Sequence, residues 1–178
     1  SLETTAALRL SPLLASYARA HPGVDLVLKT GTTAEMVEHV LDRDIEGAFV
    51  CGPVVHPQLV STPAFVEELA LLTAPDETSV AAALHRPDLR LVILRAGCSY
   101  RQRLEEVLAR RGVVGLRRLE FGTLEAILGA VAAGLGITLM PRGLIGPAWR
   151  GAKVRAHRLP VGEAKVQTVF ARRRDMRP

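Results

Sequence analysis

Short apolar runs alternate with helical patterns along most of this chain. Strand-like, almost continuously apolar runs lie at residues 24–30, 47–52, 68–74, 89–95, 116–121, 136–140, 154–160 and 166–173. Apolar residues at helical spacing lie over residues 4–20, 33–42, 100–111 and 123–134. Pro12 falls within the first helix and is expected to kink it or to open its regular part. The alternation predicts an α/β fold with mostly parallel sheets flanked by helices.

The alternation falls into two series, which predicts two lobes. The polar stretch of residues 74–79 separates them. The last strand-like run has no helical pattern after it, so we expect it to return to an existing sheet. The predicted first lobe comprises residues 1–73 and 165–178. The predicted second lobe comprises residues 77–160, with crossing segments near residues 73–77 and 160–165.

Composition and charge indicate a folded, basic protein. Of the 178 residues, 48% are hydrophobic, which is ample for packed cores. The net charge is +5, yet the arginines are scattered and only 4% of residues are aromatic, so basicity alone does not predict nucleic-acid binding. No apolar run approaches the roughly 20 residues of a membrane span. Residues 1–10 lack the basic start of a secretion signal. We therefore expect a cytoplasmic chain without membrane contact.

Familiar signatures of enzymes and metal sites are missing from the sequence. It contains no GxSxG, HExxH, GxxxxGK[ST] or strand-following GxGxxG motif. The histidines never reach metal-ligand spacing, and neither Cys51 nor Cys98 belongs to a CxxC pair. We expect no catalytic residue, no metal and no cofactor.

One local pattern recurs where strand-like runs meet helices and at the start of the chain: small or hydroxyl-bearing residues at a helix opening. These candidate ligand-binding residues are Thr4, Thr5, Thr30, Gly31, Thr32, Thr33, Cys98, Ser99, Tyr100, Gly122 and Thr123. Any single Ser or Thr at such a place is an ordinary helix cap. Their recurrence, twice in each predicted lobe, favours a cleft lined by hydroxyls and backbone amides. Arg101 follows one of the turns, either as a counter-charge to an anion or on a solvated helix face.

Several stretches together resemble a known family. They are the opening helix ETTAALRL, HPGVDL and TGTT, then DRDIEGAFV from Asp42, RAGCSYRQRLE, and AILGAVAAGLGITLMP over residues 126–141. Over essentially the whole chain the sequence is similar to the effector-binding, or regulatory, domain of LysR-type transcriptional regulators.

The resemblance implies a two-lobe fold like that of type 2 periplasmic binding proteins. A small effector would lie between the lobes and contact the residues named above, with Arg101 helping to select an anion. It implies a homodimer or higher homo-oligomer, formed through the helices of residues 4–20 and 100–111. DNA would be bound only through an N-terminal winged helix-turn-helix that this chain lacks, and the helix usual after the last strand is missing beyond Asp175.

Three other functions are open on the sequence. A free-standing solute-binding protein for transport would share the fold. A thiol redox switch would use Cys51 and Cys98, which end or follow strands of different predicted lobes. A small hydrolase would need a base beside Cys98, and no histidine is near it in the sequence. The leading hypothesis is an effector-sensing domain that shifts between two arrangements when the ligand binds.

Overall fold

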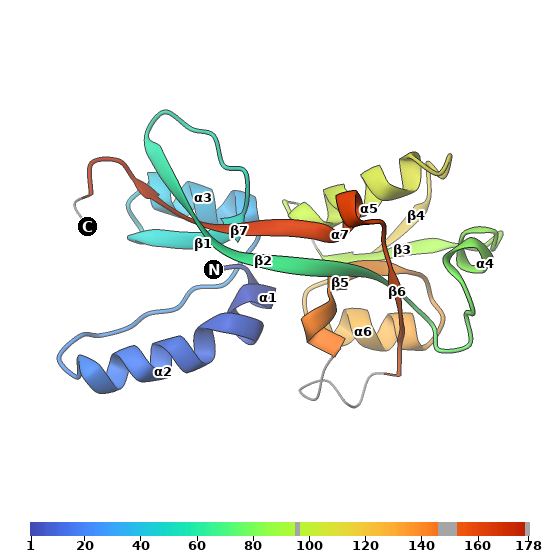
Figure 1. The fold of residues 1–178 in the computed structure, drawn as a ribbon, viewed down its shortest axis with the longest axis horizontal. Coiled ribbons are helices and arrows are strands. Elements are labelled where there is room, and N and C mark those ends of the chain that lie inside the picture. Colours follow the sequence, from blue (N-terminus) through green and yellow to red (C-terminus); the bar gives the residue numbers. More distant parts are fainter. Residues whose placement is uncertain (95–96, 146–152, 177–178) are drawn as a thin grey trace. The chain divides into compact units, whose positions relative to one another are not determined.

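The computed structural model describes residues 1–94, 97–145 and 153–176 (Figure 1). Contacts divide the chain into two compact units, Ser1–Val66 with Val166–Pro178 and Glu67–Lys165. We call them unit 1 and unit 2. The first boundary falls inside a long strand, β2 (Leu59–Thr73), rather than in the polar stretch of residues 74–79.

Unit 1 packs a nine-residue helix against an antiparallel strand pair. Its elements are α1 (Glu3–Thr5), the π-helical turn η1 (Ala6–Leu10), α2 (Ser11–Ala20), α3 (Thr33–Leu41), β1 (Gly47–Cys51), the start of β2, and β7 (Lys165–Arg173). Pro12 lies in the first turn of α2, where a proline costs no hydrogen bond, so it opens the regular helix. β1 pairs antiparallel with β7 from Gly47–Arg172 to Cys51–Thr168. The core between α3 and this pair contains Met36, Val40, Ala48, Val50, Leu59, Val169 and Ala171.

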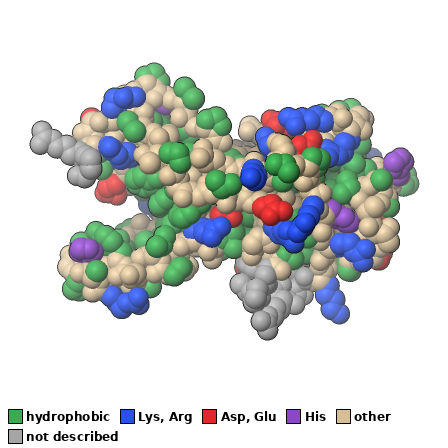
Figure 2. Space-filling view, in the orientation of Figure 1, with side chains coloured by type: hydrophobic (Ala, Val, Ile, Leu, Met, Phe, Trp, Pro, Cys, Tyr) green, Lys and Arg blue, Asp and Glu red, His purple; other side chains and the backbone are tan. Residues whose placement is uncertain are grey.

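The strand predicted over residues 24–30 is wrong. This stretch is extended, but it joins no strand ladder in the described structure, and Val27 is 76% exposed. Helix α2 beside it in the sequence has no buried residue, and its Leu13 is 54% exposed. Figure 2 shows apolar side chains on the surface of this part of unit 1. Apolar content predicted a buried strand, but a strand also needs a neighbour to pair with, and unit 1 supplies none there.

Unit 2 surrounds two small sheets with helices. Its elements are the end of β2, α4 (Val80–Leu84), β3 (Arg90–Leu94), α5 (Ser99–Ala109), β4 (Arg117–Phe121), α6 (Leu124–Ala132), β5 (Thr138–Pro141), the 3₁₀ turn η2 (Arg142–Ile145), β6 (Arg155–Arg158) and α7 (Val161–Ala164). β3 and β4 run parallel, and an isolated parallel bridge joins Leu91 to Ile137. β2 pairs antiparallel with both β5 and β6.

Parallel pairing is therefore less extensive than the sequence pattern predicted. The β1–β7, β2–β5 and β2–β6 ladders are antiparallel, whereas β3–β4 is parallel. β2 is 15 residues long, and its two ends belong to different units. The strands β5 and β6 that pair with it run antiparallel to it. The short helices α4 and α7 were not predicted, because four or five residues are too few to show a helical period. No helix in the described ranges is both long and apolar enough to cross a bilayer.

Candidate functional site

In unit 1, backbone hydrogen bonds bring the start of the chain against the turn of residues 29–33. Gly31 N donates to Ser1 O at 3.1 Å, and a parallel bridge joins Leu2 to Gly31. Leu2 N also donates to Phe49 O at 3.0 Å, which holds the same segment on β1. The structure thus brings Ser1 and Leu2, the residues just before Thr4 and Thr5, against the Thr30–Thr33 turn, although about 25 residues separate the two candidate groups in the sequence.

The turn itself is held by the cap of α3. Thr32 Oγ1 accepts from Glu35 N at 3.3 Å, and Glu35 Oε2 accepts from Thr32 N at 2.8 Å, which completes a capping box. A Cβ on Gly31 would lie 2.7 Å from Glu35 Oε2, so a larger residue there would have to move the carboxylate of the capping box. Thr33 Oγ1 accepts from Cys51 N at 3.3 Å and ties the turn to the end of β1. Thr32 and Thr33 therefore have structural roles, whatever else they bind.

Thr5 differs from its neighbours in the turn. Its residue is 2% exposed, and its Oγ1 has no hydrogen-bond partner; among the described buried side-chain atoms, only Arg103 Nε shares that condition. A buried hydroxyl without a partner costs free energy, so such groups call for a specific explanation. Because the helix that carries Thr5 starts directly after the Leu2–Gly31 bridge, this hydroxyl is suited to a ligand polar group. The sequence named Thr5 but gave no sign that its hydroxyl is unsatisfied.

In unit 2, parallel pairing brings two of the candidate turns to one edge. Leu94 at the end of β3 pairs with Phe121 at the end of β4, so both strands finish together. α5 begins at Ser99 with Cys98 as its N-cap residue, and α6 begins at Leu124. The predicted residues Cys98–Arg101 and Gly122–Thr123 therefore belong to one edge, where helix N-termini concentrate amide donors.

The two turns of unit 2 differ in local support. Thr123 caps α6, since its Oγ1 accepts from Ala126 N at 3.2 Å. Gly97 has a φ of 87°, a left-handed conformation that favours glycine and turns the chain into α5. Gly122 has nothing within 4 Å of the position of an added Cβ. The backbone at 122 is thus open on one side, unlike that at Gly31.

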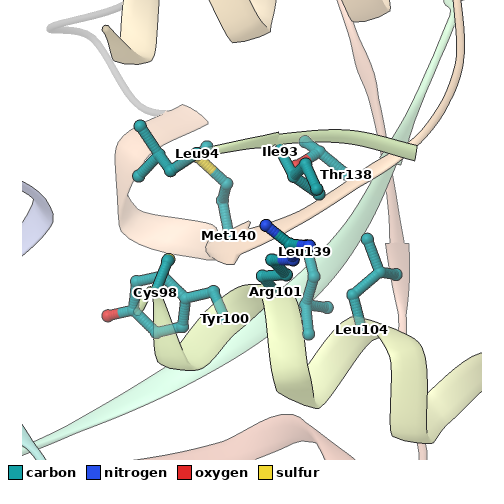
Figure 3. Close-up of a pocket in the computed structure, with 9 residues that line it drawn as sticks. All are labelled: Ile93, Leu94, Cys98, Tyr100, Arg101, Leu104, Thr138, Leu139 and Met140. Atoms are coloured by element: carbon teal, nitrogen blue, oxygen red, sulfur yellow. The ribbon is translucent and has the colours of Figure 1, made fainter. Parts of the chain in front are cut away.

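A small pocket lies behind the first of these turns (Figure 3). Its lining residues are Ile93, Leu94, Cys98, Tyr100, Arg101, Leu104, Thr138, Leu139 and Met140. The cavity volume is about 10 Å³, which is room for roughly one water molecule. Cys98 and Tyr100 are buried in it. Thr138 and Met140 were missed by sequence reasoning, because the GITLM run indicated only a core strand. The signal available in the sequence is a threonine inside that apolar run, and in the structure it is 2% exposed.

Arg101 is neither a lone counter-charge nor a freely solvated side chain. Its Nη1 lies 3.0 Å from Glu120 Oε1 on β4, and its Nε lies 3.7 Å from Glu105 Oε1 one turn along α5. The side chain is 18% exposed. Glu105 also binds Arg118, whose Nε lies 3.0 Å from the same oxygen. The positive charge of Arg101 is therefore balanced within unit 2.

Comparison with known proteins fits this arrangement of turns and sheets. The family description "LysR substrate binding domain" matches residues 1–178. The chain belongs to this family. The HTH-type transcriptional regulator GltR of Bacillus subtilis is 39% identical over 98% of this chain and 59% of its own length. The LysR substrate-binding domain thus spans about three fifths of that curated relative.

Solved structures share the fold of this LysR substrate-binding domain. The regulatory domain of Synechocystis PCC6803 CcmR in complex with 2-PG has a TM-score of 0.80 and 20% identity, covering 98% of this chain and 86% of that one. The effector binding domain of QuiR in complex with shikimate also has a TM-score of 0.80, at 13% identity, covering 99% and 86%. These similarities confirm the predicted two-lobe, periplasmic-binding-protein-like α/β fold class.

The cysteines of this LysR substrate-binding domain, Cys51 and Cys98, lie in different units. Burial raises the pKa of the Cys98 thiol, and amide hydrogen bonds from residues 101 and 100 offset this only in part. A raised pKa lowers the thiolate fraction, which disfavours nucleophilic chemistry at Cys98. Within the described ranges, no group of three or more His, Cys, Asp or Glu side chains could hold a metal ion.

Proposed function

We propose that this chain is the effector-binding domain of a LysR-type transcriptional regulator and that it senses a small anion. The relative GltR is named a transcriptional regulator, and CcmR and QuiR domains of the same fold are described in complex with 2-PG and shikimate. In the proposal, DNA is bound by a winged helix-turn-helix elsewhere in the full-length protein. The domain acts in the cytoplasm as a binding module rather than as an enzyme.

The proposed site takes a share from each unit. Unit 1 supplies Thr4, Thr5 and Thr30–Thr33, and unit 2 supplies Cys98–Arg101 with Gly122 and Thr123. The proposal keeps the two lobes predicted from the sequence, residues 1–73 with 165–178 and residues 77–160, joined by crossing segments near 73–77 and 160–165; their bounds differ from those of units 1 and 2. The effector then lies between them, and its binding favours one arrangement of the lobes over another.

The observation that carries the proposal is the buried, unpartnered hydroxyl of Thr5, which lies three residues after Leu2, the residue that pairs with Gly31. An effector oxygen or nitrogen would satisfy it and so recover the cost of its burial. The anionic character of the effector is inferred from the N-termini of α3, α5 and α6, whose first amides favour negative charge. Shikimate, bound to QuiR, is an anion of this kind.

We further propose that the protein is a homodimer or higher homo-oligomer through the exposed apolar face of α2 and the solvent-facing side of α5. Leu13 and Tyr17 on α2 are 54% and 45% exposed, and Val27 in the following segment is 76% exposed. A run of exposed apolar side chains on a folded domain is typical of a protein interface.

The experiment that tests the function is a calorimetric and thermal-shift screen of the domain against shikimate, other small carboxylates, inorganic phosphate and sulfate. A ligand at about a hundredfold excess over its Kd is expected to stabilise the domain by about 2.7 kcal/mol. Thr5→Val and Ser99→Ala are expected to weaken the binding. Thr62→Val removes a hydroxyl from an exposed position of β2 and serves as the matched control.

Two outcomes contradict the proposal. If a ligand binds but neither Thr5→Val nor Ser99→Ala changes its Kd relative to Thr62→Val, the proposed site is wrong. If the full-length regulator has the same operator affinity and DNA bending with and without a saturating ligand, the sensing function is wrong.

A further inference from the structure

An ion-pair network in unit 2 joins the two turns of its proposed site. Arg101 on α5 reaches Glu120 on β4 through Nη1 at 3.0 Å and Glu105 through Nε at 3.7 Å. Arg118, also on β4, binds the same Oε1 oxygen of Glu105 at 3.0 Å. Figure 2 shows basic and acidic side chains interleaved over this part of the surface. The four residues form one chain of alternating charge, with two positive and two negative groups.

Arg101 and Glu120 each lie within two residues of one of the two candidate turns of unit 2. Arg101 is two residues beyond Ser99, where α5 begins. Glu120 is two residues before Gly122, where β4 has just ended. The Arg101–Glu120 pair therefore links the turn at Cys98–Tyr100 to the turn at Gly122–Thr123. Main-chain pairing at Leu94–Phe121 aligns the strand ends, but Arg101 connects the helix itself to β4.

We propose that Arg101 is a positioning residue: it holds the two turns of unit 2 in register and does not serve as the counter-charge to the effector. This inference rests on the proposed function, because it concerns the same site. The Arg101 side chain is 18% exposed and faces two carboxylates, so a ligand anion would compete with them for its charge. Recognition of the anion in unit 2 then falls to hydroxyls and helix N-terminal amides.

The chemistry of arginine fits a link of this kind. Two different guanidinium nitrogens contact two carboxylates that lie on different elements. A lysine has one compact ammonium on a flexible stem, and it cannot reproduce that fork. Arg101→Lys therefore keeps the charge and loses the link, which separates the positioning role from a direct electrostatic one.

The test measures the Kd of shikimate, inorganic phosphate and sulfate by calorimetry on the wild-type domain and on Arg101→Lys, Arg101→Gln and Glu120→Gln. If Arg101 positions the turns, all three variants are expected to weaken binding by a similar factor, roughly twofold to fivefold, as expected for one partly exposed ion pair. Arg118→Gln removes an arginine from the same network but leaves the Arg101–Glu120 pair, so it is the control and is expected to change Kd less.

The opposite pattern overturns the inference. A direct counter-charge would leave binding largely intact in Arg101→Lys, and Glu120→Gln would tighten it by freeing the guanidinium. Equal Kd values in all variants would also contradict the positioning role.

A second readout does not need a ligand. Amide hydrogen exchange at Ser99, Gly122 and Thr123 is expected to be faster in Arg101→Lys and Glu120→Gln than in wild type or Arg118→Gln. Unchanged exchange would reject the link even if none of the three probes bound. If the wild type bound none of them while exchange rose as expected, the link would stand and anion sensing as proposed would fail.

Discussion

Helices α2 and α5 show how similar sequence patterns lead to different surroundings. Both were predicted from apolar residues at helical spacing, and both formed. α5 buries Tyr100, Leu104, Val107 and Leu108, whereas α2 buries no residue at all. The pattern thus predicts that a helix has an apolar face but not what covers it. In α5 the cover is the core of unit 2, and for α2 we propose a second copy of the protein.

The largest expected effect is on the stability that the buried face of α5 provides. Leu104 is 0% exposed, and Leu104→Ala is expected to lower the free energy of unfolding by about 2 to 5 kcal/mol, through lost burial and the cavity left behind. Leu13→Ala, the same change on exposed α2, is expected to cost the isolated monomer less than about 1 kcal/mol. Urea denaturation at low protein concentration measures both, and equal losses would contradict the contrast.

The next effect concerns the exposed side. Tyr17→Asp places a charge on the α2 face and is expected to weaken dimerisation by at least about 30-fold, which is the loss of roughly 2 kcal/mol typical of a central interface residue. Ala15→Asp adds the same charge on a different face of the helix and is the control. Sedimentation equilibrium measures the dimer constant, and a Tyr17→Asp protein as dimeric as the control would reject α2 as the interface.

Thr5→Val tests whether the unpartnered hydroxyl is kept at a cost to stability. Because valine matches the shape of threonine without its hydroxyl, the ligand-free domain is expected to gain about 1 kcal/mol in the free energy of unfolding. Thermal and urea unfolding measure the gain. A loss of stability would mean that Thr5 Oγ1 already has a partner, and the main support for the proposed site would fall.

The smallest effect concerns the ion pair between α7 and Arg111 in the turn after α5. Glu163 on α7 binds Arg111 at 2.7 Å, and that hydrogen bond is the main reason that the pKa of the Glu163 carboxyl is lowered. A lowered folded-state pKa means that the pair stabilises the fold above the unfolded pKa of about 4.5 and loses this contribution as pH falls further.

Glu163→Gln is therefore expected to cost at most about 1 kcal/mol near pH 7, and the difference from wild type is expected to shrink below pH 4.5. Urea unfolding at several pH values measures it. A stability difference that stayed constant down to acid pH would show that the charge of the Glu163 carboxylate does not contribute to this contact.

Most elements of this domain were predictable, and the exceptions have physical causes. The apolar runs at β3, β4 and β7 were found within about a residue of their ends, because each is bounded by polar or glycine residues. The prediction of a strand at residues 24–30 was wrong because a strand needs a neighbouring strand to pair with, and the sequence of the segment does not show whether one is present. The candidate turns were predictable because hydroxyl and glycine residues between a strand and a helix are typical of a helix N-terminus.

Local periodicity and short motifs were enough to predict the α/β class, the position of each candidate turn and the resemblance to the LysR family. Which hydroxyls already have a hydrogen-bond partner became visible in the folded structure alone. It showed Thr32 occupied by a capping box, Thr5 buried without a partner, and Arg101 balanced by Glu120. Hydrogen-bond satisfaction and charge balance depend on groups distant in the chain, so they arise only when the fold brings those groups together.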